Sequence, residues 1–191
     1  MTGFLEILLA ALVAVTLENC IFTTAIGTST LIECAREPKH LLSFGIFITE
    51  FSILSSILAY FAEKLLKSDA AQLFLPSLYV LCLGTVYVLT LLCIWFVARK
   101  WFKGLKKYVH LSAFNCAVLG CLFNNGLSGG SLGERILYAV EVGLGFILAT
   151  YLLAINYKKL SSEDVPASFR GFPASILYIG FIAMILYGMK I

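Results

Sequence analysis

Long apolar stretches, separated by short polar segments that carry nearly all of the charge, follow one another along the whole chain. Each is long enough for a membrane-spanning helix, which needs about 20 residues. None shows the alternation of apolar and polar residues that a membrane β-barrel requires. The pattern predicts an all-α integral membrane protein with six transmembrane helices. The predicted spans are 3–32, 41–66, 73–98, 109–127, 132–157 and 171–189.

The composition supports this class. Of the 191 residues, 60% are hydrophobic and 13% are charged, whereas soluble domains are roughly 45–50% apolar and about 25% charged. A soluble protein of this length could not bury so much apolar surface. Six spans with short loops use up the chain, so we expect a single membrane domain over 1–191. The first stretch lacks a basic leader and carries Glu6, so we expect it to remain in the mature protein.

The basic residues predict the orientation. Ten of the 14 Lys and Arg residues lie in three loops on one side of the predicted bundle, and four lie on the other side. By the positive-inside rule the first side faces the cytoplasm, so both termini of this multi-pass protein lie outside. The ten are Arg36, Lys39, Arg99, Lys100, Lys103, Lys106, Lys107, Lys158, Lys159 and Arg170, and the four are Lys64, Lys67, Arg135 and Lys190.

The densest basic segment runs from Arg99 to Lys107. We interpret it as a topology signal that also contacts anionic membrane lipid. A docking site for a soluble partner is the alternative. Nucleic acid is not an expected partner, because a basic stripe that binds it needs an aqueous surface.

An Asn-Cys pair occurs in the first predicted helix, at Asn19-Cys20, and again in the fourth, at Asn115-Cys116. These helices begin two three-helix halves, about 1–100 and 101–191. Because three is an odd number, the second half enters the membrane from the other side, which predicts two inverted repeats. Both pairs would then approach the bilayer centre from opposite faces. Chance recurrence of a common dipeptide is the alternative.

The paired residues suggest metal chemistry. Thiolates are soft ligands suited to iron–sulfur clusters, zinc or copper(I), and an iron–sulfur cluster normally takes four of them. Cys20 and Cys116 therefore offer half a site, and a second chain would supply the rest. The amides of Asn19 and Asn115 are expected to donate hydrogen bonds to sulfur. The other cysteines are expected to be structural, as small buried hydrophobes; they are Cys34, Cys82, Cys93 and Cys121.

Three carboxylates fall inside predicted spans, at Glu18, Glu50 and Glu141. Ionisable residues at this depth are costly and indicate function. Two interpretations stay open. The carboxylates lie on an ion path, or each is neutral and hydrogen-bonded to a neighbouring subunit.

Two segments carry a resemblance to a known family. Residues 115–120 read Asn-Cys-Ala-Val-Leu-Gly, and residues 164–171 read Asp-Val-Pro-Ala-Ser-Phe-Arg-Gly. Together with Glu18-Asn19, the length and the six spans, they resemble the membrane subunits of the Rnf ferredoxin:NAD oxidoreductase and of the sodium-pumping NADH:quinone oxidoreductase. The resemblance covers essentially the whole chain. The outward N-terminus is similar to that of the Rnf A and Nqr E subunits.

The resemblance implies an electron-relay subunit of an ion-translocating complex in the cytoplasmic (inner) membrane of a bacterium or archaeon. It implies a homologous six-helix partner of opposite topology, a [2Fe-2S] cluster shared with that partner, and further subunits that carry flavin and iron–sulfur centres. The chain has no Gly-rich nucleotide loop and no run of closely spaced cysteines. We therefore expect no catalytic residue in it and no catalysis by the chain alone.

One position departs from the family pattern. The family has Gly-x-Cys late in helix one, whereas this chain has Gly-Thr-Ser, ending at Ser29. Cys116 matches the helix-four ligand directly. Because a serine hydroxyl is a poorer iron ligand than a thiolate, we expect Cys20, at the pseudo-symmetric position, to replace the missing cysteine. Loss of the cluster, or binding with fewer cysteines, is the alternative.

Another class of function fits part of the pattern. A small secondary transporter, or the membrane component of a vitamin-uptake system, also has inverted repeats and polar residues near the midplane, and needs no metal. A structural assembly subunit with inert cysteines is a third interpretation. A spectrum of the purified complex would separate these from a redox subunit.

Overall fold

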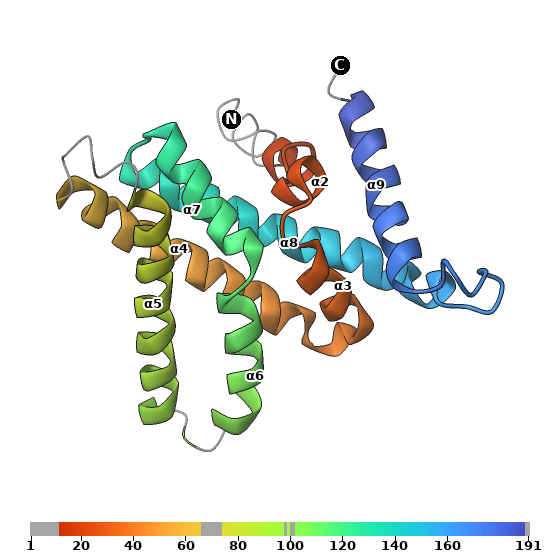
Figure 1. Cartoon of the computed structure of the whole chain (residues 1–191), viewed down its shortest axis with the longest axis horizontal. Coiled ribbons are helices and arrows are strands. Elements are labelled where there is room, and N and C mark those ends of the chain that lie inside the picture. Colours follow the sequence, from red (N-terminus) through yellow and green to blue (C-terminus); the bar gives the residue numbers. More distant parts are fainter. Residues whose placement is uncertain (1–11, 66–73, 98, 100–101, 190–191) are drawn as a thin grey trace, which may run out of the picture. The chain divides into compact units, whose positions relative to one another are not determined.

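The computed structural model describes residues 12–65, 74–97, 99 and 102–189. This part of the chain is helical and contains no strand, which confirms the predicted all-α class (Figure 1). Several predictions fall outside the described residues. They concern Lys67, Lys100, Lys190 and the start of the first span at 3–11.

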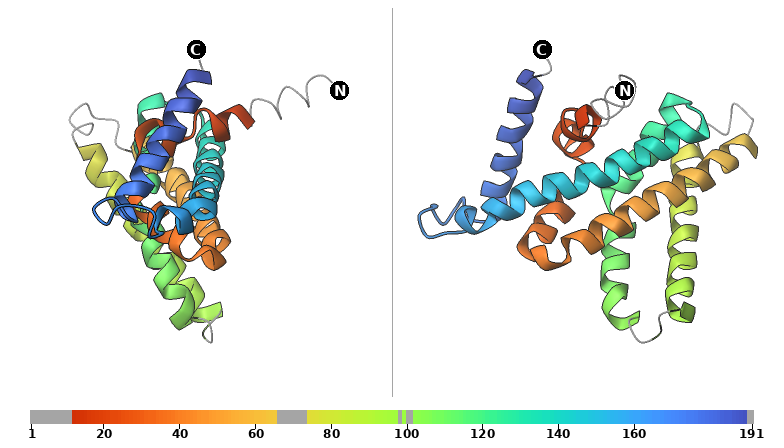
Figure 2. Two further views of the ribbon diagram at one scale, coloured as in Figure 1. Left: turned by 90° about the vertical axis from the view of Figure 1, so that its right-hand side faces the viewer. Right: turned by 180° about the vertical axis from the view of Figure 1, so that it is seen from behind.

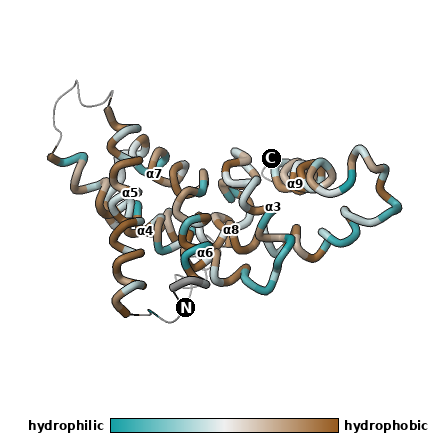
Figure 3. The backbone as a smooth tube through the Cα atoms, turned by 60° about the horizontal axis from the view of Figure 1, so that its bottom comes forward, coloured by the Kyte–Doolittle hydropathy of each residue, from teal (hydrophilic) through white to brown (hydrophobic). Residues whose placement is uncertain are grey.

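Among the described residues, four helices are long and apolar enough to cross a membrane. Their bounds agree within a few residues with the second, third, fifth and sixth predicted spans. In Figure 3 hydrophobic stretches predominate along the helices. The four are α4 (Leu41–Leu65), α5 (Leu75–Val97), α8 (Leu132–Leu160) and α9 (Phe172–Met189).

The first predicted span is broken rather than continuous. Its described part comprises Leu12–Thr24, which includes α2 (Cys20–Thr24), and α3 (Thr28–Arg36), and the two pieces meet at 108°. The backbone turns through left-handed conformations at Ala25 (φ 57°) and Gly27 (φ 87°). Glycine adopts such angles freely, whereas a residue with a Cβ does so at a cost. A short 3₁₀ turn, η1 (Pro38–His40), leads on to α4.

The fourth predicted span is also divided, into α6 (Phe102–Ala113) and α7 (Cys116–Ser128). The Asn115 side chain accepts a hydrogen bond from the Ala117 amide and so starts a new helix. Lys106 and Lys107, predicted to lie in a loop, lie on α6 instead. The described residues therefore contain four candidate spans, or five if the bent pair counts as one. The sixth span and the inverted repeat stay predictions.

The chain divides into two compact units, each described here by itself. The first comprises Met1–Leu42 and Leu144–Ile191, and in it α2 and α3 pack against α9. The second comprises Ser43–Gly143, and in it α5 packs against α6 and α7. Figure 2 shows α5 and α6 side by side in this unit.

Candidate functional site

Each Asn-Cys pair starts a helix. Asn19 is the N-cap of α2 and Asn115 is the N-cap of α7, so Cys20 and Cys116 are the first residues of these helices. Each Asn Oδ1 accepts a hydrogen bond at 3.0 Å from the backbone amide two residues later. Asparagine is among the best N-cap residues because its side chain satisfies an amide that the helix leaves unpaired. The repeated dipeptide therefore has a repeated local structure, which we name the two Asn-Cys turns.

The two Asn amide groups differ in their partners. Both residues are buried, with 2% of Asn19 and 0% of Asn115 exposed. Asn19 Nδ2 donates to the Val15 carbonyl at 3.1 Å and to the Gly145 carbonyl of α8 at 2.9 Å. Asn115 Nδ2 has no hydrogen-bond partner among the described residues. A buried unpaired donor is costly. Of the two Asn side-chain amides, the one of Asn115 is therefore available to donate to an additional acceptor.

Gly145 lets Asn19 approach α8. A Cβ added at Gly145 would lie 2.9 Å from Asn19 Nδ2 and 3.0 Å from its Cγ. Real Cβ atoms essentially never come closer than 3.0 Å to such a neighbour. The hydrogen bond from Asn19 to α8 therefore depends on a glycine at this position.

The two candidate ligands are free thiols in different units. Cys20, in the first unit, is half-buried, and Cys116, in the second, is exposed. Ser29, at the family's usual ligand position, is an exposed residue in the first turn of α3. Among the residues that the structure describes, no group of three or more His, Cys, Asp or Glu side chains could hold a metal ion. Each turn thus offers one thiol as a single ligand.

The remaining cysteines are mostly buried. Cys34, Cys82 and Cys121 are buried, which agrees with a packing role. Cys93 is exposed on α5, although its apolar sequence neighbours suggested a buried position.

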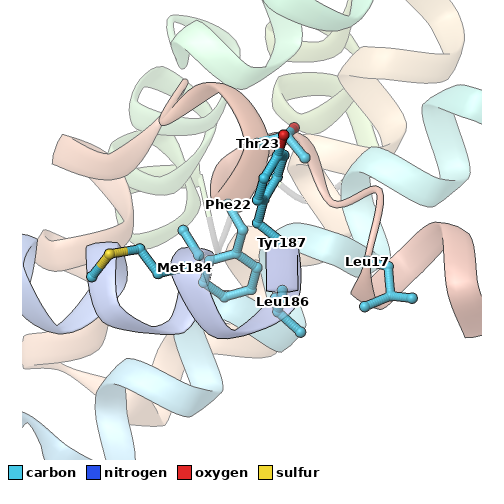
Figure 4. A pocket seen from close by; sticks show the side chains of 7 residues that line it. Leu17, Phe22, Thr23, Met184, Leu186 and Tyr187 are labelled. Carbon is cyan, nitrogen blue, oxygen red and sulfur yellow. The ribbon is translucent and has the colours of Figure 1, made fainter. Parts of the chain in front are cut away.

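The first Asn-Cys turn packs on α9. A pocket of about 620 Å³ is lined by Leu17 before α2, Phe22 and Thr23 of α2, and Met184 and Tyr187 among residues of α9 (Figure 4). Phe22 is buried here. An isolated helix as short as α2 is unstable in water. Contacts with α9 and the bond from Asn19 to α8 are therefore what hold this turn in place.

The three carboxylates lie on different segments. Glu18 is exposed and directly precedes the first turn, Glu50 lies on α4, and Glu141 is half-buried on α8. Glu50 lines a groove between α4 and α5 within the second unit. The ion-path interpretation of these residues stays a prediction.

Sequence reasoning missed a buried polar network in the second unit. Arg135 Nη2 donates to Glu63 Oε2 at 2.8 Å, and the two side chains are 5% and 19% exposed. The Tyr79 hydroxyl donates to Glu63 Oε1 at 2.9 Å. Asn125 of α7 donates to the Arg135 carbonyl at 3.2 Å and to the Ser56 hydroxyl at 2.9 Å. The sequence did contain a signal for this ion pair, because Glu63 lies near the end of the second predicted span and Arg135 near the start of the fifth.

Comparison with known proteins identifies similar chains. The family model described as "Rnf-Nqr subunit, membrane protein" matches residues 6–191. The chain is 26% identical to the A subunit of the ion-translocating oxidoreductase complex of Tolumonas auensis, over 96% of each chain. It is 24% identical to the A subunit of the Na(+)-translocating ferredoxin:NAD(+) oxidoreductase complex of Acetobacterium woodii, over 93% of each chain. The corresponding chain of the ion-translocating oxidoreductase complex of Syntrophotalea carbinolica is also 24% identical, over 96% of this chain and 95% of its own.

Proposed function

The chain belongs to the Rnf-Nqr family of membrane subunits, and from this premise we propose that it relays electrons within an ion-translocating oxidoreductase complex. In this proposal Cys20 and Cys116 supply two thiolates to a [2Fe-2S] cluster, and a homologous six-helix partner of opposite topology supplies the other two. Further subunits carry flavin and iron–sulfur centres. The family match favours a redox complex over the metal-free transporter.

The observation that carries the proposal is the pair of Asn-Cys turns. Each presents a free cysteine as the first residue of an Asn-capped helix. The donor set fits the cluster, because thiolate is its usual ligand and each Asn-Cys turn carries one cysteine. When bound, a [2Fe-2S] cluster supplies one-electron transfer.

The neighbouring side chains have separate tasks in this proposal. Both amide hydrogens of Asn19 are engaged by carbonyl groups, so Asn19 orients Cys20 by fixing the turn. Asn115 Nδ2 is buried without a partner among the described residues, so it is the amide that can donate to a ligand sulfur. Such hydrogen bonds alter a cluster's reduction potential.

We propose the orientation with both termini outside and Lys106 and Lys107 of α6 on the cytoplasmic side, in the cytoplasmic membrane of a bacterium or archaeon. The unequal distribution of basic residues supports it. A reporter fused between α5 and α6 should be cytoplasmic. An external reporter there would exclude this orientation. For Glu18 and Glu141, an ion path remains the proposed role.

Electron paramagnetic resonance of the purified, reduced complex tests the cluster. We expect a [2Fe-2S] signal that is lost in Cys116→Ala. Cys82→Ala is the matched control, because Cys82 is a buried cysteine of the same unit without an adjacent Asn, and it should keep the signal. Equal signals in Cys116→Ala and wild type would refute ligation by Cys116.

Ser29→Cys gives a second test. If Cys20 has taken over the ligand position, Ser29→Cys leaves the signal of the wild-type complex unchanged in intensity. A stronger signal would indicate that the ordinary family position is still the better ligand site.

A further inference from the structure

A groove of about 350 Å³ runs between α4 and α5 in the second unit. Both helices are long and apolar enough to span the membrane. The groove is open rather than sealed, since several of its large apolar side chains are exposed. Its lining includes Glu50, Leu54 and Phe61 from α4, and Leu89, Thr90 and Cys93 from α5.

Glu50 is the feature that sets this groove apart from an ordinary lipid-facing surface. The carboxyl group is half-buried, and it makes no hydrogen bond or ion pair with any residue that the structure describes. Hydrocarbon chains of lipid have no hydrogen-bond donor. An unpaired carboxyl group at this depth is unfavourable, so an occupant that donates a hydrogen bond is favoured over lipid.

The exposed side of α5 suits close packing by another helix. Within this chain 22% of the apolar stretch of α5 is buried, compared with 44% for that of Pro38–Leu65, which contains α4. Ser77, Gly84 and Thr85 line a second depression on α5, and a Cβ added at Gly84 would meet nothing within 4 Å. Small residues of this kind allow membrane helices to approach closely.

We propose that the groove between α4 and α5 docks a transmembrane helix of a different membrane subunit, which donates a hydrogen bond to Glu50 from an amide, hydroxyl or basic side chain. The proposal rests on the proposed function, because it requires a multisubunit complex. Glu50 was interpreted either as part of an ion path or as hydrogen-bonded to a neighbouring subunit, and the proposal selects the hydrogen bond. The docking energy comes from apolar packing along the groove, and the hydrogen bond fixes the depth of the incoming helix.

Photo-crosslinking in native membranes tests this surface. A photoreactive phenylalanine analogue replaces the exposed groove residue Leu89 in the full chain, and crosslinked peptides are identified by mass spectrometry. We expect a peptide from a predicted transmembrane segment of another subunit that co-purifies with the chain. A crosslink to lipid alone, or to a second copy of this chain, would overturn the proposal.

Two variants at Glu50 test the hydrogen bond. Glu50→Gln keeps an acceptor oxygen and should keep the crosslink. Glu50→Leu removes the acceptor and should lower the crosslink yield roughly tenfold, the change that 1.4 kcal/mol produces in an equilibrium constant. An undiminished yield in Glu50→Leu would contradict the proposed bond.

A steric pair separates loss of docking from loss of folding. Leu54→Trp fills the groove and should abolish the crosslink from position 89, whereas Ile46→Trp, at an exposed position of α4 outside the groove, should not. Equal yields in the two variants would refute docking in the groove. If the complex purifies intact and position 89 reaches only lipid, this inference fails and the proposed function stands. If no other subunit co-purifies with the wild-type chain, both fail.

Discussion

The two Asn-Cys turns have the same dipeptide and the same capping hydrogen bond, but they are anchored in different ways. In the first, Asn19 reaches beyond its own turn to the Gly145 carbonyl of α8. In the second, the Asn115 amide nitrogen has no partner among the described residues, and α7 is held near its far end, where Asn125 bonds Ser56 and the Arg135 carbonyl. The helix α2 is therefore held at its start, and α7 near its end.

Helix length explains the difference. The first turn leads into a helix of 5 residues, which has too few internal hydrogen bonds to persist without tertiary contacts. The second leads into a helix of 13 residues, which can be positioned by its C-terminal end. The start of α7 therefore remains able to bind something else without losing its support.

Removing the ion pair that holds Arg135, whose backbone carbonyl accepts from Asn125 near the end of α7, should have the largest effect. Arg135→Ala leaves the largely buried Glu63 carboxylate without its cationic partner, with the Tyr79 hydroxyl still donating to it, and should lower the free energy of unfolding by about 3–5 kcal/mol. Reversible unfolding in detergent or bicelles measures it. Arg36→Ala is the matched control, because the Arg36–Glu33 side chains are 54% and 60% exposed, and exposed pairs contribute about 0–1 kcal/mol. Similar losses in both variants would mean that the Arg135–Glu63 pair contributes no more to stability than an exposed pair.

The two caps should differ in their contribution to stability. Asn19→Ala removes the cap and the two hydrogen bonds from the Asn19 amide to the Val15 and Gly145 carbonyls, so we expect a loss of about 3 kcal/mol. Asn115→Ala removes only the cap, so we expect about 1 kcal/mol. The same unfolding assay compares them. Equal losses would show that the bond from Asn19 to α8 contributes nothing to stability.

Gly145→Ala should disturb the first turn alone, with a loss of about 1–3 kcal/mol from the contact between the new Cβ and Asn19. In a double-mutant cycle with Asn19→Ala the two losses should not add, because both act on one contact. Gly180→Ala on α9 is the control, since a Cβ there meets nothing within 4 Å. Strict additivity in the cycle would contradict the packing of Gly145 against Asn19.

The long helices could be predicted from the sequence, and the breaks could not. The ends of α4, α5, α8 and α9 fall where apolar runs meet polar or charged residues, and hydropathy alone detects this. Asn19 and Asn115 were interpreted as polar residues inside continuous spans. Hydropathy does not distinguish one long helix from two short helices, because both have the same run of apolar residues. Gly27 lies at the bend between α2 and α3. A glycine bends the chain there only because its backbone adopts a left-handed angle, and the sequence alone does not give that angle.

The candidate site could be predicted only in part. Cys20 and Cys116 were predicted as ligands because a dipeptide recurs, and the structure gives both the same local position at the start of a helix. The different partners of Asn19 and Asn115 could not be foreseen, since Gly145 is distant in sequence from Asn19. The pairing of Glu63 with Arg135 likewise depends on how α4 and α8 pack within the second unit.

The equivalence of the two turns as ligands is tested most directly by the [2Fe-2S] electron paramagnetic resonance signal of the purified complex that carries Cys20→Ala. Thermal unfolding of the same sample checks that the complex remains assembled. We predict an assembled complex whose signal is lost, as in Cys116→Ala, because each turn supplies one thiolate. An assembled complex with the full wild-type signal would contradict the account, since Cys20 would then not be a ligand.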